Sequence, residues 1–247
     1  MATKIIVFRP NYEIATKYGH YWFNENVKKP ALDAGFEVID LEGDNANRRN
    51  VVDNLPNPQV VYFAGVGHGR RDMFTGQNHE MIFDYDDNTT CNIVKNKVIH
   101  LLSCETGRLL LPWMADNCGA KACFGYKEVW GFKISEFPND LAKPFFDSDT
   151  TFDRCLFEGA TVKEAFERTK QRYDYWLENA PESCRPLLLH DRDAMVVFGD
   201  LNARIVQPPP PPPPPPPPEP WWKRLISAIK ELIKKILEII RRILCES

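Results

Sequence analysis

The sequence has no run of 18 uncharged apolar residues, so we expect no segment that spans a bilayer. Its first residues, Met1 to Lys4 ahead of a short apolar stretch, lack the pattern of a signal peptide. The seven cysteines stand at irregular spacings without a CxxC pair, which argues against a disulfide framework and against a structural zinc site. We therefore expect a cytoplasmic protein with free thiols that uses no metal and no cofactor.

Positive charge is scarce over most of the chain. Residues 1–207 carry 24 Lys and Arg against 30 Asp and Glu, whereas residues 208–247 carry 7 against 4. An acidic body is poorly suited to binding a phosphate backbone, so we expect no nucleic-acid partner. The basic balance is confined to the C-terminal part, which therefore needs a separate explanation.

Short apolar runs alternate with segments of helical periodicity. Strands are predicted at residues 4–8, 36–41, 60–64, 97–102, 122–126 and 194–200, the last with its exit turn. Helices are predicted at residues 11–34 with a break at Pro30, at 45–55, at 109–117 and, in two parts, at 141–179. A polar insertion after residue 69 is predicted to form a short β excursion. The alternation indicates an α/β fold with a mainly parallel six-stranded sheet and helices on both faces.

Two of the predicted strands end in residues that together suggest nucleophilic chemistry. The strand at 97–102 runs into Ser103-Cys104-Glu105-Thr106-Gly107, and the strand at 60–64 runs into Gly65-Val66-Gly67-His68-Gly69. Parallel strands end at one edge of a sheet, so we expect Cys104 and His68 to lie close together. A thiol becomes a strong nucleophile when a base takes its proton or a nearby helix N-terminus lowers its pKa. We expect His68 to act as the base and the N-terminus of the helix after Cys104 to lower the pKa of the thiol.

A glycine beside the histidine has a predicted role of its own. The backbone N–H groups of Gly69 and Cys104 are predicted to form an oxyanion hole. A cysteine at a strand end is by itself more often a small buried residue, and a lone His-Gly pair is common. The combination on successive predicted strands favours catalysis. The four other histidines and the remaining cysteines lack such a context and are predicted to be structural or solvated.

These segments resemble the caspase-like clan of cysteine peptidases. The resemblance rests on strand-then-His68-Gly69, on strand-then-Ser103-Cys104-Glu105-Thr106-Gly107, and on the closing Gly199-Asp200 after the last strand. The nearest pattern is that of the gingipain, clostripain and CHAT-domain branch, although Leu201 stands where proline is common there. The resemblance implies a caspase-like three-layer sandwich over residues 1–207, with His68 as base and Cys104 as nucleophile in peptide-bond cleavage.

The resemblance also implies where a substrate side chain binds. In this clan the loop after the fifth strand helps to build the pocket for P1, the residue before the scissile bond. That loop holds Glu128, which would select a basic P1, and Trp130 as an apolar wall. Arg70 and Arg71 directly follow His68-Gly69 and would instead favour an acidic P1. Both alternatives stay open at this point.

The composition changes abruptly after residue 207. Residues 208–218 are all proline and are predicted to form, with residues 219–220, a semi-rigid polyproline linker. Residues 221–247 repeat Ile and Leu every seven positions and carry 7 basic against 3 acidic residues behind paired tryptophans. They are predicted to form an amphipathic helix that either self-associates as a coiled coil or lies on a membrane surface.

The sequence therefore predicts a cysteine endopeptidase with a Cys-His dyad, acting on a protein or peptide substrate. Its C-terminal helix would make it a homo-oligomer or dock it at a membrane. The alternatives are a catalytically inactive CHAT-like scaffold that assembles through the same helix, and a thiol-dependent acyl transferase that uses the same dyad.

Overall fold

The computed structural model describes residues 3–134, 141–206, 230–231, 233–237 and 241. Contacts divide the chain into two units, residues 1–209 and 210–247. The first unit contains a six-stranded sheet with the strand order β2-β1-β3-β7-β8-β9. All its pairings are parallel except that between β8 and β9. The strands are β1 (Lys4–Arg9), β2 (Glu37–Glu42), β3 (Val60–Val66), β7 (Val98–Leu102), β8 (Ala122–Tyr126) and β9 (Met195–Gly199).

The side chains of each central strand alternate between two separate hydrophobic cores, one on each face of the sheet. In β1, Ile5 and Val7 join the core on one face of the sheet, whereas Ile6 and Phe8 join the core on the other face. Both sets are fully buried, because successive side chains of a strand point to opposite faces and helices cover both. The continuous apolar runs in the sequence follow directly from this arrangement.

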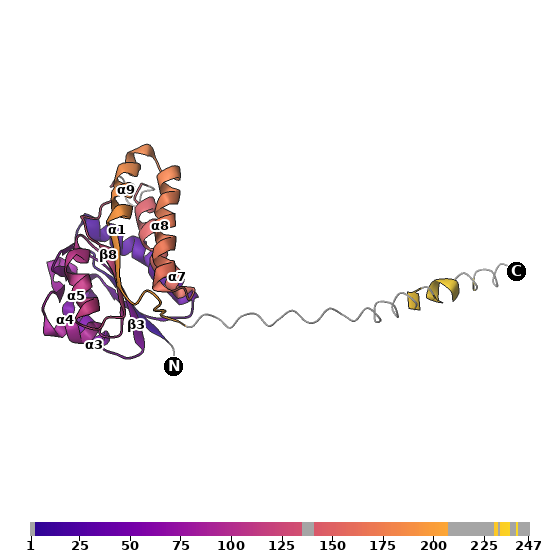
Figure 1. Ribbon diagram of the computed structural model, residues 1–247, viewed down its shortest axis with the longest axis horizontal. Coiled ribbons are helices and arrows are strands. Elements are labelled where there is room, and N and C mark those ends of the chain that lie inside the picture. The colour runs from indigo at the N-terminus through magenta and orange to yellow at the C-terminus, as the bar shows by residue number, and fades with distance from the viewer. Residues whose placement is uncertain (1–2, 135–140, 207–229, 232, 238–240, 242–247) are drawn as a thin grey trace. The chain divides into compact units, whose positions relative to one another are not determined.

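Helices cover both faces of the sheet, giving the predicted three layers (Figure 1). One face carries α1 (Ile14–Phe23), α2 (Lys29–Asp33), α6 (Lys143–Asp149), α7 (Thr151–Phe157), α8 (Val162–Asn179) and α9 (Arg185–Ala194). The other face carries α3 (Arg48–Asn54), α4 (Asn88–Val94), α5 (Leu110–Asp116) and a small antiparallel sheet of β4 (Gly69–Arg70), β5 (Met73–Thr75) and β6 (Met81–Asp84). The small sheet is the predicted β excursion.

The helices differ from the prediction in four places. The first helix is not broken at Pro30, because a π-helical turn at Asn24–Lys28 shifts the hydrogen bonding and Pro30 falls in the first turn of α2. The predicted pair of helices over 141–179 is three helices. Thr150, with a ψ of 0°, separates α6 from α7, and Gly159 with a φ of 88° and the cap residue Thr161 separate α7 from α8. Helices α4 and α9 were not predicted.

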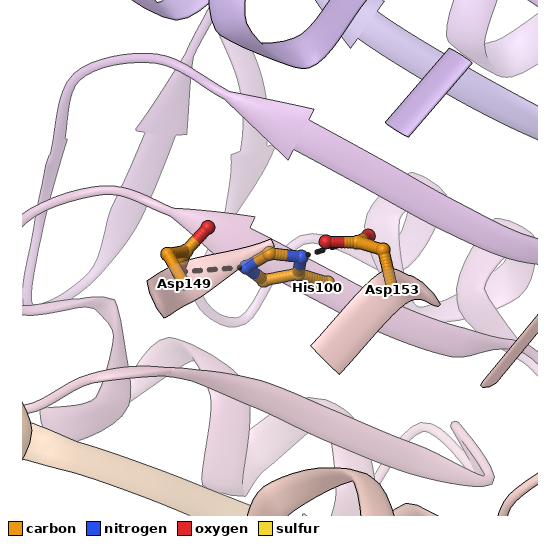
Figure 2. Close-up of side chains that lie close together, drawn as sticks. All are labelled: His100, Asp149 and Asp153. Carbon is orange, nitrogen blue, oxygen red and sulfur yellow. Dashed lines mark hydrogen bonds and ion pairs between the residues drawn. The ribbon is translucent and has the colours of Figure 1, made fainter. Parts of the chain in front are cut away.

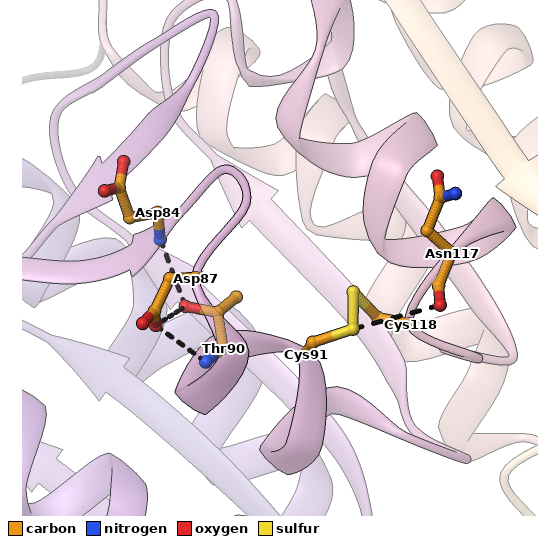
Figure 3. Close-up of a disulfide and its surroundings, with 6 residues drawn as sticks. All are labelled: Asp84, Asp87, Thr90, Cys91, Asn117 and Cys118. Atoms are coloured by element: carbon orange, nitrogen blue, oxygen red, sulfur yellow. Dashed lines mark hydrogen bonds between the residues drawn. A yellow bond between two sulfur atoms is a disulfide. The ribbon is translucent and has the colours of Figure 1, made fainter.

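Two cysteines form a disulfide, so the expectation of free thiols is wrong for them. Cys91 in α4 is bonded to Cys118, which follows α5, across a sequence separation of 27 residues (Figure 3). The Asp87 carboxylate accepts a hydrogen bond from the Thr90 N–H at 2.8 Å and thereby fixes the start of α4. Helices α4 and α5 pack on the same core, and this packing brings together two cysteines whose spacing in the sequence shows no motif.

The predicted linker at 208–220 and most of the predicted helix at 221–247 lie outside the described residues. The residues that are described, 230–231, 233–237 and 241, are helical and exposed. Within the part of the chain that the structure describes, no helix combines the length and the apolar character needed to cross a membrane.

Candidate active site

Three loops meet at the carboxyl edge of the parallel strands. Chain connections run to opposite sides of β1, so the crevice between β1 and β3 is a topological switch point, where α/β sheets bind ligands. Glu13 follows β1, His68 follows β3 and Cys104 follows β7. The sheet therefore delivers a carboxylate, an imidazole and a thiol to one edge.

The imidazole of His68 is paired with a carboxylate. Its Nε2 atom contacts Glu13 Oε1, and both side chains are partly exposed. The ring of His79 stacks on the ring of His68 with centroids 5.4 Å apart, and Tyr12 Oη lies 3.1 Å from His79 Nδ1. These contacts fix the plane of the His68 ring. Because Nε2 is engaged by Glu13, Nδ1 is the ring nitrogen left to exchange a proton.

The thiol of Cys104 is half-buried and needs a base. It donates a hydrogen bond to the Trp130 carbonyl oxygen at 3.7 Å. Burial raises the pKa of the Cys104 thiol, and the charge of Glu105 adds to the increase. Cys104 does not stand at the N-terminus of a helix, which was expected to lower the pKa of its thiol. Glu105 follows at a φ of 57°, and a short 3₁₀ turn at Thr106–Arg108 separates Cys104 from α5. The sulfur is therefore mostly a thiol at neutral pH.

His68 and Cys104 border one cavity of about 90 Å³. It is lined by Ala15, Thr16, Val66, Gly67, His68, Leu102, Ser103, Cys104, Trp130, Phe132 and Phe146. In the described part of the chain, the hydrogen bonds of the two catalytic candidates go to Trp130 and Glu13 rather than to each other. Candidate catalytic hydrogen bonds often form only when substrate is bound.

Gly69 lies against the backbone of Cys104. A Cβ atom built on Gly69 would be 2.8 Å from the Cys104 carbonyl oxygen and 2.9 Å from Ser103 Oγ, so only glycine fits without a shift. The Thr75 N–H donates to the His68 carbonyl at 2.9 Å. Hydrogen-bonded pairs alternate along an antiparallel ladder, so the next pair, Gly69 opposite Phe74, is a non-hydrogen-bonded one. The Gly69 N–H is thus directed away from β5, as the predicted oxyanion hole requires.

The predicted substrate-binding residues fall in different places. Trp130 lines the cavity beside Cys104. Glu128 is outside the cavity lining and forms an ion pair with Arg108. Arg70 is exposed and pairs with Asp72 at 2.8 Å, and Arg71 is likewise exposed.

Glu13 is the residue that sequence reasoning missed. It was placed within the predicted first helix, and in the structure it is the residue that caps the N-terminus of α1. Its position four residues past the end of β1 was the available signal, because an acidic residue just after a buried parallel strand lies at the edge where ligands bind.

A second, fully buried polar cluster lies between the sheet and the helices α6 and α7. His100 on β7 is flanked by Asp149 of α6 and Asp153 of α7, with nitrogen–oxygen distances of 3.2 and 3.1 Å (Figure 2). Tyr62 and Tyr126 each donate to one of these carboxylates at 2.7 Å. Burial lowers the pKa of His100, but the charges of Asp153 and Asp149 outweigh burial and raise the pKa to about 10.

This cluster is the group of described residues with the donor types of a metal site. The imidazole lies between the two carboxylates and each ring nitrogen faces a different one, so the donors do not converge on one point (Figure 2). A protonated histidine donates to Oδ1 of each carboxylate without an ion, while Oδ2 of Asp149 and Oδ2 of Asp153 have no hydrogen-bond partner among the described residues. We interpret the cluster as a buried charge network.

The charge network continues to the cavity. Tyr126 Oη lies 2.9 Å from Tyr173 Oη, which accepts a hydrogen bond from Trp130 Nε1 at 3.2 Å. Trp130 in turn accepts the hydrogen bond of the Cys104 thiol on its carbonyl oxygen. The side chain that forms one wall of the cavity is therefore anchored to the core of the domain.

Comparison with known proteins finds similarity in structure alone. No protein-family model and no curated protein matches the sequence. The fold is similar to that of the Arg-specific cysteine proteinase gingipain R, with a TM-score of 0.55 and 14% identity over 82% of this chain and 47% of that one. It is also similar to caspase-1 from Spodoptera frugiperda, with a TM-score of 0.52 and 10% identity over 84% of this chain and 90% of that one.

A complex of the pro- and mature domains of a Porphyromonas gingivalis protein gives a TM-score of 0.55 with 12% identity, over 83% of this chain and 49% of that one. This chain thus spans about half the length of the gingipain structure. This similarity confirms the predicted α/β fold with a mainly parallel six-stranded sheet. The chain has the fold of the caspase-like cysteine peptidases.

Proposed function

We propose that the protein is a cysteine endopeptidase, with Cys104 as nucleophile and His68 as general base. The observation that carries the proposal is that both side chains border one cavity at the switch point of a caspase-like sheet. The raised pKa of the Cys104 thiol adds to the argument, because such a thiol requires a base and His68 is the imidazole beside the cavity.

In the proposed mechanism, the Cys104 thiol transfers its proton to His68 as the sulfur–carbon bond forms at the scissile carbonyl. The N–H groups of Gly69 and Cys104 stabilise the negative oxygen of the tetrahedral intermediate. His68 then gives the proton to the leaving amine, which breaks the carbon–nitrogen bond and leaves a thioester. Water hydrolyses the thioester, and its proton passes through His68 to the departing sulfur.

Glu13 is assigned the role of holding the His68 ring. A carboxylate on one ring nitrogen fixes the tautomer and stabilises the imidazolium that forms when the thiol is deprotonated. The contact between Glu13 Oε1 and His68 Nε2 supports this role.

The test is cleavage of a fluorogenic peptide mixture by the full chain and by Cys104→Ala, His68→Ala and Cys155→Ala. Cys155 is a buried cysteine of α7 and serves as the matched control. We expect cleavage that is lost in the first two variants and kept in the third. Adding an amine acceptor and analysing products by mass spectrometry separates hydrolysis from acyl transfer. No cleavage by the full chain, even when assembly is forced, would favour the inactive scaffold.

The same proposal assigns residues 1–207 to catalysis, residues 208–220 to a spacer and residues 221–247 to localisation or assembly. Ile233, Ile236 and Leu237 are exposed apolar residues of that helix, which supports either self-association or contact with a membrane surface. A chain truncated after Gln207, compared with the full chain by sedimentation and by flotation with anionic vesicles, separates the two forms of the proposal.

A further inference from the structure

The cavity beside Cys104 is placed to receive the side chain next to the scissile bond. It extends from the sulfur between α1, the loop after β8 and α6, with Ala15, Trp130 and Phe146 contributing from these three elements. A carbonyl carbon bonded to the sulfur has its own α-carbon within a few ångströms of it. The group that enters the cavity is therefore the side chain on that α-carbon, the P1 residue.

The walls of this cavity are apolar. Ala15, Val66, Leu102, Trp130, Phe132 and Phe146 supply them. The two hydroxyls that border it are already engaged, since Thr16 Oγ1 accepts from the Tyr12 and Glu13 N–H groups and Ser103 Oγ lies 3.2 Å from Thr106 Oγ1. Apart from the catalytic candidates, no residue that the structure describes presents an ionisable group to this space.

A charged P1 side chain would lose its hydration here without gaining a partner. Burial of an unpaired charge in an apolar site is strongly unfavourable, which is enough to exclude a charged P1 side chain. Of the charges predicted to select P1, Glu128 pairs with Arg108, Arg70 pairs with Asp72, and Arg71 is outside the cavity lining.

Resting on the proposed peptidase function, we propose that the cavity selects an uncharged aliphatic P1 residue such as Val, Leu or Met. The size of the cavity favours aliphatic over aromatic side chains. A dry apolar cavity of ~150 Å³ binds benzene, whereas this one measures about 90 Å³. The aromatic walls contributed by Trp130, Phe132 and Phe146 give an aliphatic group large contact areas.

The first test is a library of fluorogenic peptides that differ only at P1, cleaved by the full chain. We expect kcat/KM for Leu or Met at P1 to exceed that for Arg, Lys, Asp or Glu by at least about a hundredfold, the range in which pocket contacts discriminate. Preferred cleavage after a basic residue would overturn the inference and favour Glu128. Preferred cleavage after an acidic residue would overturn it in favour of Arg70 and Arg71.

The substitution Ala15→Asp is designed to reverse the P1 preference from an aliphatic to a basic residue. Ala15 lies in the first turn of α1, where a carboxylate is compatible with the helix dipole, and it lines the cavity. We expect this variant to lose cleavage after Leu and to gain cleavage after Arg. Ala34→Asp, which adds the same charge at an exposed position, is the matched control and should keep the wild-type ranking. An unchanged ranking in Ala15→Asp would contradict the assignment of the cavity.

A binding measurement separates this inference from the proposed catalysis. The Cys104→Ala chain is titrated with acetylated tripeptide amides ending in Leu, Arg or Asp, and the shift in Tm is recorded. A shift with the Leu peptide alone supports the pocket even if no peptide is cleaved. Equal shifts, or none with the Leu peptide, overturn the inference, while loss of cleavage with intact binding would count against the peptidase function only.

Discussion

Replacing His100 by Phe removes the positive charge from the buried charge network without leaving a void. The rings of Phe124, Phe152 and Phe23 lie 4.8, 5.7 and 6.0 Å from the imidazole, so an aromatic side chain has suitable neighbours. Asp149 and Asp153 would lose their cationic partner in a fully buried site. Breaking a buried ion pair in this way typically costs about 3 to 5 kcal/mol.

The pH dependence gives this prediction its sign. The pKa of His100 is about 10 in the folded protein, above the ordinary value of 6.5. The imidazolium therefore stabilises the wild-type fold fully below pH 6.5, and this contribution is lost as the pH rises through 10. The shift corresponds to a free energy on the order of 5 kcal/mol, which agrees with the cost expected for the substitution.

The assay is urea unfolding of wild type and His100→Phe at pH 4.5, 7 and 9. At pH 7 we expect the midpoint of the variant to fall by roughly 1 to 2 M, given the urea m-values usual for domains of this size. The difference between the two urea midpoints should be smaller at pH 4.5. Burial already raises the pKa of Asp149, and a carboxyl without its cationic partner is then protonated at this pH.

A control variant keeps the test informative. His100→Phe combined with Asp149→Asn and Asp153→Asn removes the unpaired charges and should recover most of the lost stability at pH 7. Equal midpoints for wild type and His100→Phe at pH 7, or a gap that does not change with pH, would refute the ionic account of the network.

Three further variants test other parts of the structure. Gly69→Ala places a methyl group 2.8 Å from the Cys104 carbonyl oxygen, so the backbone must shift, and we expect peptide cleavage to fall by about a hundredfold or more together with a lower Tm; unchanged cleavage would contradict the oxyanion assignment. Glu13→Gln should lower kcat at least tenfold and leave KM unchanged in steady-state kinetics, whereas a rise in KM alone would indicate a substrate contact. Cys91→Ser should lower the free energy of unfolding by ~3.5 kcal/mol, from the 27-residue separation that the disulfide closes, and should abolish the effect of a reductant seen in wild type.

The positions of Cys104 and His68 at one edge could be predicted from the sequence because only apolar runs and turn glycines are needed to locate parallel strands. Glu13 stands just after a predicted strand, which was a signal, but the same position suits an ordinary helix cap, so the sequence alone did not separate the two roles. The disulfide between Cys91 and Cys118 depends on how α4 and α5 pack, and neither residue carries a local signal for pairing. Pro30 was misjudged because a widened helical turn, a tertiary accommodation, lets the helix continue through it.

The hydrogen bonds from His100 through Asp149, Tyr126 and Tyr173 to Trp130 make the shape of the cavity depend on a proton held far from the substrate. Loss of that proton at alkaline pH would leave this chain of hydrogen bonds with one donor fewer. Trp130, whose carbonyl oxygen accepts the hydrogen bond of the Cys104 thiol, would then be held less firmly. A decline in activity at alkaline pH would then reflect displacement of Trp130 as well as deprotonation of the catalytic groups. Substitution of the buried carboxylates of α6 and α7 would then change the peptide preference of the proposed peptidase, although neither carboxylate lines the cavity.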